Sequence, residues 1–372
     1  MRSALSEGSP RADLKLLILN WRDLRSPRAG GAELLSHEVA KRLVERGHEV
    51  TWFTSRPQGL PAVERVDGVD VVRRGSEPTT RLFAPAFARA RAFDVLVEQI
   101  NTLPYFAPLW SQAPVVVHVN QLAREVWWYE APKPLAVLGW ASEPAYLQAY
   151  RRTPAITISE STAADLRRLG LRGRIDVIPM AVDTEPVDEL RPKRLEGHLV
   201  AIGRLAPSKR YDHAIEALAL LRASHPNATL TIVGRGRERA ALEEHARRLH
   251  VGEAVRLAGG LSEAEKTKLL TEADVLVGTS AREGWGLTVT EAALRGTPAV
   301  VYDVPGFRDS VLDKRTGLLT APSPQALAMG VRRFLDDAEL YERSRRAALE
   351  NAAALDWERT TDAFEAALAA AT

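Results

Sequence analysis

The chain has 372 residues, of which 45% are hydrophobic, so it is long enough for about two globular domains, each with its own core. Its 50 lysines and arginines are nearly balanced by 48 aspartates and glutamates, for a net charge of +2, which argues against a general nucleic-acid binder. The chain has no cysteine, no apolar run long enough to cross a membrane and no signal-peptide core at its start, so we expect a cytoplasmic protein without disulfides, thiolate catalysis or cysteine-bound metal.

Strand-like apolar runs alternate with helical patterns along the chain, after a start at residues 1–12 that we expect to be flexible. The runs of the first half lie at residues 14–19, 48–53, 69–72, 95–97, 115–119, 155–158 and 175–178. Those of the second half lie at residues 199–202, 229–233, 255–257, 275–277, 299–301 and 317–319. This alternation predicts βα units with parallel sheets, and therefore an α/β fold made of two doubly wound, Rossmann-like domains that face each other across a cleft.

One segment near the middle of the chain interrupts the alternation. Residues 183–197 contain two prolines and dense charge, which is typical of an interdomain linker. We therefore expect a first domain at residues 13–185, a linker at residues 186–197 and a second domain at residues 198–355. An alanine-rich helical pattern closes the chain at residues 357–370.

Two features of the first half are candidates for ligand binding. Gly30 and Gly31 follow the first predicted strand and open a helix, whose unpaired N–H groups could bind an anion. His118 lies at the end of another predicted strand, where a side chain would project into the cleft. A histidine with a purely structural role is the alternative.

Aromatic residues of the first half are candidates for acceptor binding. Trp127, Trp128 and Tyr129 follow Arg124, and their flat rings suit sugar rings or lipid headgroups, although the packing of a helix against the sheet would use the same residues. Residues 81–91 combine phenylalanines with arginines, as a helix at a membrane surface does, with an ordinary half-buried helix as the alternative. Weak peripheral contact with the inner face of the membrane is therefore one expectation.

Candidate anion ligands follow two predicted strands of the second half. Arg204 and Lys209 come after its first strand, and an arginine fork with a lysine charge suits a diphosphate, with two solvated loop cations as the alternative. The next strand ends in Gly234, Arg235 and Gly236, whose glycines would allow a ligand to come close. The third glycine of a dinucleotide fingerprint is missing, which argues against a nicotinamide enzyme.

The stretch from Glu283 to Glu291 places a glycine-flanked turn directly before a helix-forming sequence. Gly284 and Gly286 let the backbone approach a ligand closely, and residues 287–289 would direct N–H groups and the positive end of the helix dipole at a phosphate. The two glutamates would then address different parts of one extended ligand. A surface turn followed by a solvated helix has the same sequence features, so the rest of the chain decides.

These motifs, in this order over almost the whole chain, resemble the retaining glycosyltransferases of family 4, whose two-domain architecture is called GT-B. The resemblance is carried by residues 30–33, 178–183, 203–205 with Lys209, 233–236, the pair Glu283 and Glu291, 296–298 and 356–358. It implies transfer of a hexose from a UDP-, GDP- or ADP-linked sugar to a hydroxyl of a glycan, a glycolipid or a small molecule, with retained configuration. It also implies that residues 356–372 form a helix that crosses back onto the first domain.

The resemblance assigns a role to each candidate residue. Arg204 and Lys209 would hold the diphosphate, Glu291 would bind the ribose hydroxyls, and Glu283 and His118 would contact the donor sugar from opposite lobes. The resemblance thus implies four catalytic residues: Glu283, His118, Arg204 and Lys209. It implies that Arg204 and Lys209 also belong to the donor site, which is completed by Gly30, Gly31, Gly234, Arg235, Leu257, Leu261, Gly284, Trp285, Gly286, Leu287, Thr288 and Glu291.

Two positions depart from the family pattern and leave the donor sugar open. Met180 and Ala181 stand where the family usually has asparagine and glycine, and Trp285 stands where it usually has phenylalanine. The chain has no Asp-x-Asp motif, so we expect neither a metal nor another cofactor. A GT-B epimerase or phosphorylase, or a nucleotide-sugar-binding protein without turnover, are the alternatives, and a phosphorylase would need a longer chain.

Overall fold

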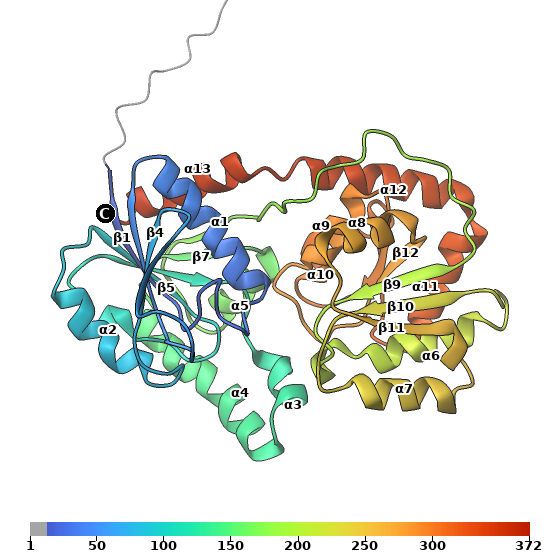
Figure 1. Cartoon of the computed structure of the whole chain (residues 1–372), viewed down its shortest axis with the longest axis horizontal. Helices are drawn as coiled ribbons and strands as arrows, with labels where there is room; N and C mark the ends of the chain where they lie inside the picture. Colours follow the sequence, from blue (N-terminus) through green and yellow to red (C-terminus); the bar gives the residue numbers. More distant parts are fainter. Residues whose placement is uncertain (1–12) are drawn as a thin grey trace, which may run out of the picture.

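The computed structural model describes residues 13–372 as two α/β domains that face each other (Figure 1). This confirms the predicted fold class, whereas the expected flexibility of residues 1–12 lies outside the described residues. All the predicted strands are present, with ends that agree to within two residues. Their near-continuous apolar runs arise because parallel strands are covered by helices on both faces, as the fully buried Leu16 and Leu17 of the first strand illustrate.

The first domain is built on an eight-stranded sheet with the order β3-β4-β2-β1-β5-β6-β7-β8. Its strands are β1 (Lys15–Leu19), β2 (Glu49–Thr54), β3 (Val63–Val66), β4 (Val69–Arg73), β5 (Val95–Gln99), β6 (Val115–Val119), β7 (Ala155–Thr157) and β8 (Ile175–Val177). Its helices are α1 (Gly31–Glu45), α2 (Thr80–Arg89), α3 (Trp127–Glu130), α4 (Lys133–Leu147) and α5 (Glu160–Arg168), with short 3-10 turns η1 (Ala107–Leu109), η2 (Arg124–Val126) and η3 (Gln148–Tyr150).

Strand β3 was not expected from the apolar runs, because only one face of this edge strand touches the protein. It pairs antiparallel with β4 through a two-residue turn at Asp67 and Gly68, both of which have positive φ. Aspartate followed by glycine is the sequence signal of such a hairpin. The signal was therefore present in the sequence, and our interpretation missed it.

The second domain is built on a six-stranded parallel sheet with the order β11-β10-β9-β12-β13-β14. Its strands are β9 (His198–Ile202), β10 (Thr229–Val233), β11 (Val255–Gly259), β12 (Val275–Gly278), β13 (Ala299–Tyr302) and β14 (Gly317–Thr320). Its helices are α6 (Tyr211–Leu221), α7 (Arg239–Arg248), α8 (Glu263–Glu272), α9 (Leu287–Leu294), α10 (Phe307–Ser310), α11 (Pro324–Asp336) and α12 (Ala338–Ala353), with 3-10 turns η4 (Pro207–Lys209) and η5 (Gly252–Ala254).

The last helix, α13 (Trp357–Ala369), crosses back onto the first domain as expected (Figure 1). Phe364 and Leu368 are buried in the core of that domain, although they follow the second domain in the chain. At the surface, Arg46 of α1 forms ion pairs with Glu358 (2.6 Å) and Asp362 (2.8 Å). The first domain is thus completed by the end of the chain.

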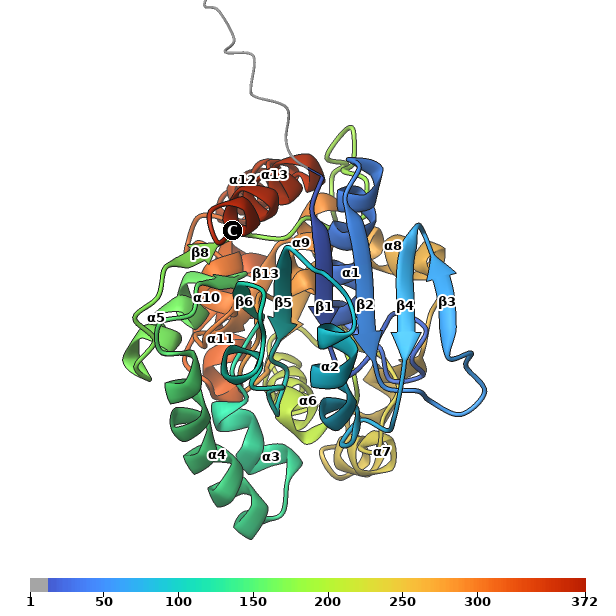
Figure 2. The same cartoon turned by 90° about the vertical axis from the view of Figure 1, so that its left-hand side faces the viewer.

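The segment between β8 and β9, residues 178–197, contains no helix or strand. We propose the domain limits given above and a hinge in this segment, since an irregular connection is the element that domain closure would bend. Among the helices of the described chain, none combines the length and the apolar character that spanning a bilayer requires. Figure 2 shows that α3 and α4 extend together below the sheet of the first domain.

Candidate active site between the domains

The two predicted helix starts face each other across the domain interface. A Cβ atom added at Gly31, the first residue of α1, would lie 2.8 Å from Cδ1 of Leu287, the first residue of α9. A Cβ atom at Gly284 would lie 2.9 Å from the carbonyl oxygen of Asn120 in the first domain. Gly286 has a φ of 101°, which a residue with a side chain rarely adopts. These glycines are therefore needed so that the two domains and the start of α9 can meet.

The two helix starts differ in what they offer to an anion. The α9 start has no side-chain cap, and the N–H groups of Leu287 and Thr288 find no acceptor within residues 13–372. At α1, by contrast, the N–H of Gly30 donates to Oε2 of Glu33 at 2.8 Å. Burial raises the pKa of Glu33, but its carboxylate still occupies this helix start. The α9 start is therefore the stronger anion site.

Lys209 and Glu283 form an ion pair beside the start of α9. The hydroxyl of Ser280 donates to the same carboxylate at 2.6 Å, and the N–H of Glu283 donates to the carbonyl of Pro305 at 3.0 Å. Gly306, with a φ of 85°, lies so close to the Glu283 carbonyl that no side chain would fit between them. The backbone and the side chain of Glu283 are thus both fixed, next to a cation predicted to bind diphosphate.

Arg204 lies on the loop after β9 with its guanidinium exposed to solvent. Its side chain forms no hydrogen bond or ion pair with any residue of the described chain, whereas its backbone carbonyl accepts the N–H of Ala206 at 2.9 Å. Such a cation, next in sequence to the loop that carries Lys209, is available for a ligand.

Gly234 lies against the backbone of a neighbouring loop, whereas we expected it to lie against a ligand. A side chain on Gly234 would collide with the carbonyl of Gly203, and one on Gly236 would collide with the carbonyl of Leu205. The glycines are needed because two neighbouring loops pack directly on each other, with the N–H of Leu205 donating to the carbonyl of Arg235 at 2.9 Å. This packing holds Arg235 against the loop of Arg204.

The two leucines of the predicted donor site are both half-buried. Leu257 lies within β11, and Leu261 follows that strand. They lie at the carboxyl edge of the sheet, where α/β domains bind their ligands. The structure therefore places them on the same edge as the other donor-site candidates of this domain.

Glu291 lies on α9, and its Oε1 is 3.0 Å from Nζ of Lys266 on α8. Lys266 also pairs with Glu263 at 2.8 Å. Burial raises the pKa of Glu291, and Lys266 opposes this shift. Lys266 could not be identified from the sequence, because only the packing of α8 beside α9 brings it to this site.

His118 is covered rather than projecting into an open cleft, which corrects our expectation. Its side chain is 2% exposed, and its ring meets the ring of Phe364 from α13 edge-on, with centroids 5.6 Å apart. Burial lowers the pKa of His118 to about 4, so the ring is neutral at pH 7. Its Nε2 and both polar side-chain atoms of Asn120 are buried without a hydrogen-bond partner in the described structure. Unsatisfied polar groups of this kind are costly, and they are accordingly candidates for ligand contacts.

Arg282, which was not among the predicted site residues, links the Glu283 loop to the first domain. Its side chain is 3% exposed and pairs with Glu125 (2.6 Å) of η2 and Asp165 (2.8 Å) of α5. The next aromatic, Trp285, is buried in the core of the first domain and donates from Nε1 to the Thr290 hydroxyl at 3.0 Å. Nothing in the sequence separates Arg282 from a solvated arginine, because its partners are far away in the chain.

The acceptor-side aromatic residues divide into packed and exposed groups. Trp127 packs on α4, where a side chain at Gly139 would collide with its ring. Arg124 lies over the ring of Trp140, 4.5 Å from its centroid. The helix-packing alternative therefore holds for Trp127, although it packs on α4 instead of the sheet.

Trp128 and Tyr129, in contrast, are 48% and 37% exposed. Glu130, which follows them, accepts a hydrogen bond from the Ser208 hydroxyl at 2.5 Å. Ser208 precedes Lys209, so α3 borders the candidate diphosphate site.

No group of three or more metal-ligating side chains gathers anywhere in residues 13–372. The chemistry that the described residues themselves offer is a fixed carboxylate, two cations and an uncapped helix start from the second domain. Opposite them lie buried neutral polar groups of the first domain. Such a set can hold an anionic group on one side and an uncharged polar group on the other.

Two family models together match most of the chain. Residues 29–186 match glycosyltransferase family 4, and residues 188–351 match the glycosyl transferases group 1. A glycogen synthase of Mycobacterium tuberculosis is 29% identical over 94% of this chain and 93% of its own length.

Two solved structures share the fold. Sucrose-phosphate synthase from Thermosynechococcus elongatus has a TM-score of 0.76 and 20% identity, covering 94% of this chain and 97% of its own. Anabaena Alr3699/HepE in complex with UDP and glucose has a TM-score of 0.71 and 20% identity, covering 96% of this chain and 100% of its own. From its two-domain architecture and these matches, the chain belongs to the family 4 glycosyltransferases of the GT-B fold.

Proposed function

We propose that this glycosyltransferase moves a hexose from a nucleotide-diphosphate sugar to an acceptor hydroxyl with retention of configuration. The observation that carries the proposal is the uncapped start of α9 beside Lys209 and the free cation Arg204. The similar Anabaena structure contains UDP and glucose, which supports a donor of this class. A glycan, a glycolipid or a small molecule would accept the sugar. The cysteine-free chain agrees with a cytoplasmic location, which is part of the proposal.

The chemistry follows from the charge that develops on the leaving group. When the bond between the sugar and the diphosphate breaks, negative charge grows on a phosphate oxygen, which cations and oriented N–H groups stabilise. Arg204, Lys209 and the N–H groups of Leu287 and Thr288 would supply that stabilisation without a metal or a proton donor. The acceptor attacks from the same face, and the departing phosphate oxygen takes its proton.

Glu283 would position the donor sugar by accepting a hydrogen bond from one of its hydroxyls, and it would not attack the anomeric carbon. In the structure, its carboxylate is already engaged by Lys209 and Ser280. We expect Glu283→Gln to lose most of its turnover, because a neutral amide accepts a weaker hydrogen bond. A variant that keeps most of its turnover, or a glycosyl adduct isolated on Glu283, would overturn this role.

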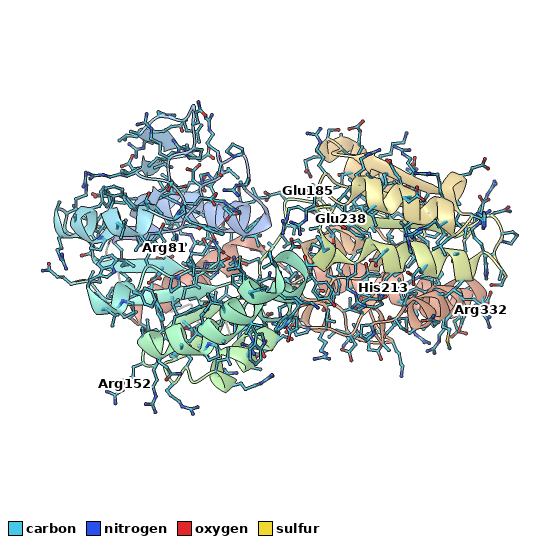
Figure 3. The ribbon with its side chains drawn as sticks, turned by 90° about the horizontal axis from the view of Figure 1, so that it is seen from below. Arg81, Arg152, Glu185, His213, Glu238 and Arg332 are labelled. Carbon is cyan, nitrogen blue, oxygen red and sulfur yellow. The ribbon has the colours of Figure 1, made fainter. Side chains whose placement is uncertain are left out.

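A thermal-shift screen against UDP, GDP and ADP and their common sugar conjugates tests the proposed function. We expect one base to stabilise the protein with or without magnesium, because ligand binding to the folded state raises the melting temperature. The shift should vanish in Arg204→Ala. Arg332→Ala serves as the control, because this arginine is 60% exposed and lies on the far side of the second domain (Figure 3). If no nucleotide shifts the wild-type protein, the proposed donor class is wrong.

A further inference from the structure

Exposed apolar side chains gather on α3 and α4. Among the described residues, six of the fifteen large apolar side chains that are exposed lie between positions 128 and 140. These six residues define the α3–α4 apolar surface: Trp128, Tyr129, Leu135, Val137, Leu138 and Trp140. Helices α3 and α4 project below the first domain, and they face the viewer when the molecule is seen from below (Figures 2 and 3).

The arrangement of α4 is the reverse of an ordinary surface helix. Its buried side carries the small residues Ala136 and Gly139, because the ring of Trp127 packs there. The large side chains of its first half point outward, with Leu135 56% exposed and Leu138 65% exposed, whereas Leu147 at its end is buried. A helix that is apolar on both sides is expected inside a core or against lipid. Folding of this chain therefore does not explain the outward residues.

The charges around α4 indicate what kind of surface would cover its exposed apolar residues. Residues 131–142 contain no carboxylate, and Glu143, the acid of this helix, is 1% exposed with its oxygens held by the N–H groups of Ala123 and Arg124 at 2.8 Å. Cations flank the apolar stretch: Lys133 at the start of α4 and Arg152 after its end are both exposed. Figure 3 shows Arg152 pointing away from the body of the protein. Apolar and aromatic residues framed by cations are typical of a helix that binds an anionic membrane surface.

Helix α2 lacks this character, although its sequence first indicated membrane contact. Phe87 is 7% exposed and Phe83 is half-buried, because both pack into the core of the first domain. Only Leu82, which is 76% exposed, remains as a large apolar side chain on the outside of this helix. The expected membrane contact at residues 81–91 is therefore wrong for the phenylalanines on which it rested.

We propose that the α3–α4 apolar surface docks this protein on an anionic lipid bilayer. The surface borders the candidate active site, because Glu130 at the end of α3 binds Ser208, the neighbour of Lys209. Docking through α4 would hold that side of the interdomain site close to the membrane, where an acceptor embedded in lipid is within reach. The docking itself does not depend on the identity of the donor.

Co-sedimentation of the full-length protein with vesicles tests this proposal. We expect the wild-type protein to pellet with phosphatidylcholine vesicles that contain phosphatidylglycerol, and to pellet less with pure phosphatidylcholine or at high salt. Leu135→Glu combined with Leu138→Glu should weaken the binding by about 100-fold, since two apolar side chains leave the lipid and two negative charges approach it. Leu82→Glu is the matched control on α2 and should bind as the wild type does.

Three results would overturn the proposal. The first is a wild-type protein that does not pellet with anionic vesicles. The second is a double variant that pellets as well as the wild type. The third is a lipid-free dimer that the double variant converts to a monomer while vesicle binding is absent, which would assign the surface to a second copy of the chain. The nucleotide-induced thermal shift should be unchanged in the double variant, so that failure here is separate from failure of the proposed function.

Discussion

The two domains present chemically different walls to the site between them. The second domain offers positive charge, from the exposed Arg204 and from Lys209, together with an uncapped helix start. The first domain offers a neutral, buried His118, the side chain of Asn120, which has no hydrogen-bond partner among the described residues, and a helix start that Glu33 already occupies. From this difference we infer that the second domain holds the anionic part of the ligand, whereas the first domain meets uncharged polar groups. Domain closure would bring the two kinds of ligand together.

The largest effect is expected at Arg282, where the second domain forms ion pairs with the first. Arg282→Met should lower the free energy of unfolding by roughly 3–5 kcal/mol, because it removes the buried cation that Glu125 and Asp165 share and leaves Asp165 only the exposed Arg168, at 3.1 Å. Urea denaturation measures the change, with Arg332→Met as the exposed control. A loss no greater than that of the control would show that the walls meet without this ion pair.

The next effect tests the charged wall. Lys209→Ala should reduce turnover by about 100- to 1000-fold, because it removes a cation from the growing charge of the leaving group. Lys268→Ala is a matched control on the same domain, since that lysine is 75% exposed and pairs with Glu272 only at 3.8 Å. The measurement is a steady-state assay with the donor that the nucleotide screen selects. Equal turnover in the two variants would remove Lys209 from the reaction.

A third prediction tests the neutral wall through its pH dependence. The pKa of His118 falls from 6.5 to about 4 on burial, so its contribution to stability is complete above pH 6.5 and is lost as the pH falls toward 4. Between pH 7 and pH 5 the wild-type protein should lose roughly 2 kcal/mol that His118→Gln does not lose. Urea denaturation at the two pH values gives the difference. The same pH dependence in both proteins would mean that His118 is not buried as a neutral ring.

The smallest effect is expected at Glu291, the proposed ribose ligand of the second domain, where nucleotide affinity and melting temperature should respond differently. Because burial raises the pKa of Glu291, its ionised carboxylate destabilises the fold at neutral pH. Glu291→Gln should therefore keep the melting temperature of the wild type, while nucleotide affinity falls by about tenfold through loss of a charged hydrogen bond. A fall in melting temperature with unchanged affinity would make Glu291 a structural residue.

The sequence predicted those parts of the molecule that depend on local patterns. Alternating strands, the helix start after Gly286 and the loop positions of Arg204 and Lys209 all follow from residues close together in the chain. Arg282 and Lys266 could not be found in this way, because their carboxylate partners lie on other elements that only the fold brings near.

The apolar helices show why composition misleads. The phenylalanines of α2 point inward, whereas Leu135 and Leu138 of α4 point outward, yet both sequences are rich in apolar residues. The period of the apolar residues does not indicate which side of a helix faces the protein when large side chains occur on both sides. For α4, the ring of Trp127 determines which side of the helix faces the protein, because it occupies the space beside Gly139.

The proposed difference between the domains requires that the second domain recognises the diphosphate by its charge. Isothermal titration with the selected nucleoside and with its diphosphate, on the wild type and on Arg204→Ala, measures this recognition. We expect the wild type to bind the diphosphate about 100-fold more tightly than the nucleoside, and Arg204→Ala to lose about tenfold in affinity for the diphosphate and nothing for the nucleoside. Equal affinity of the wild type for the two ligands would mean that the second domain does not recognise the diphosphate by its charge.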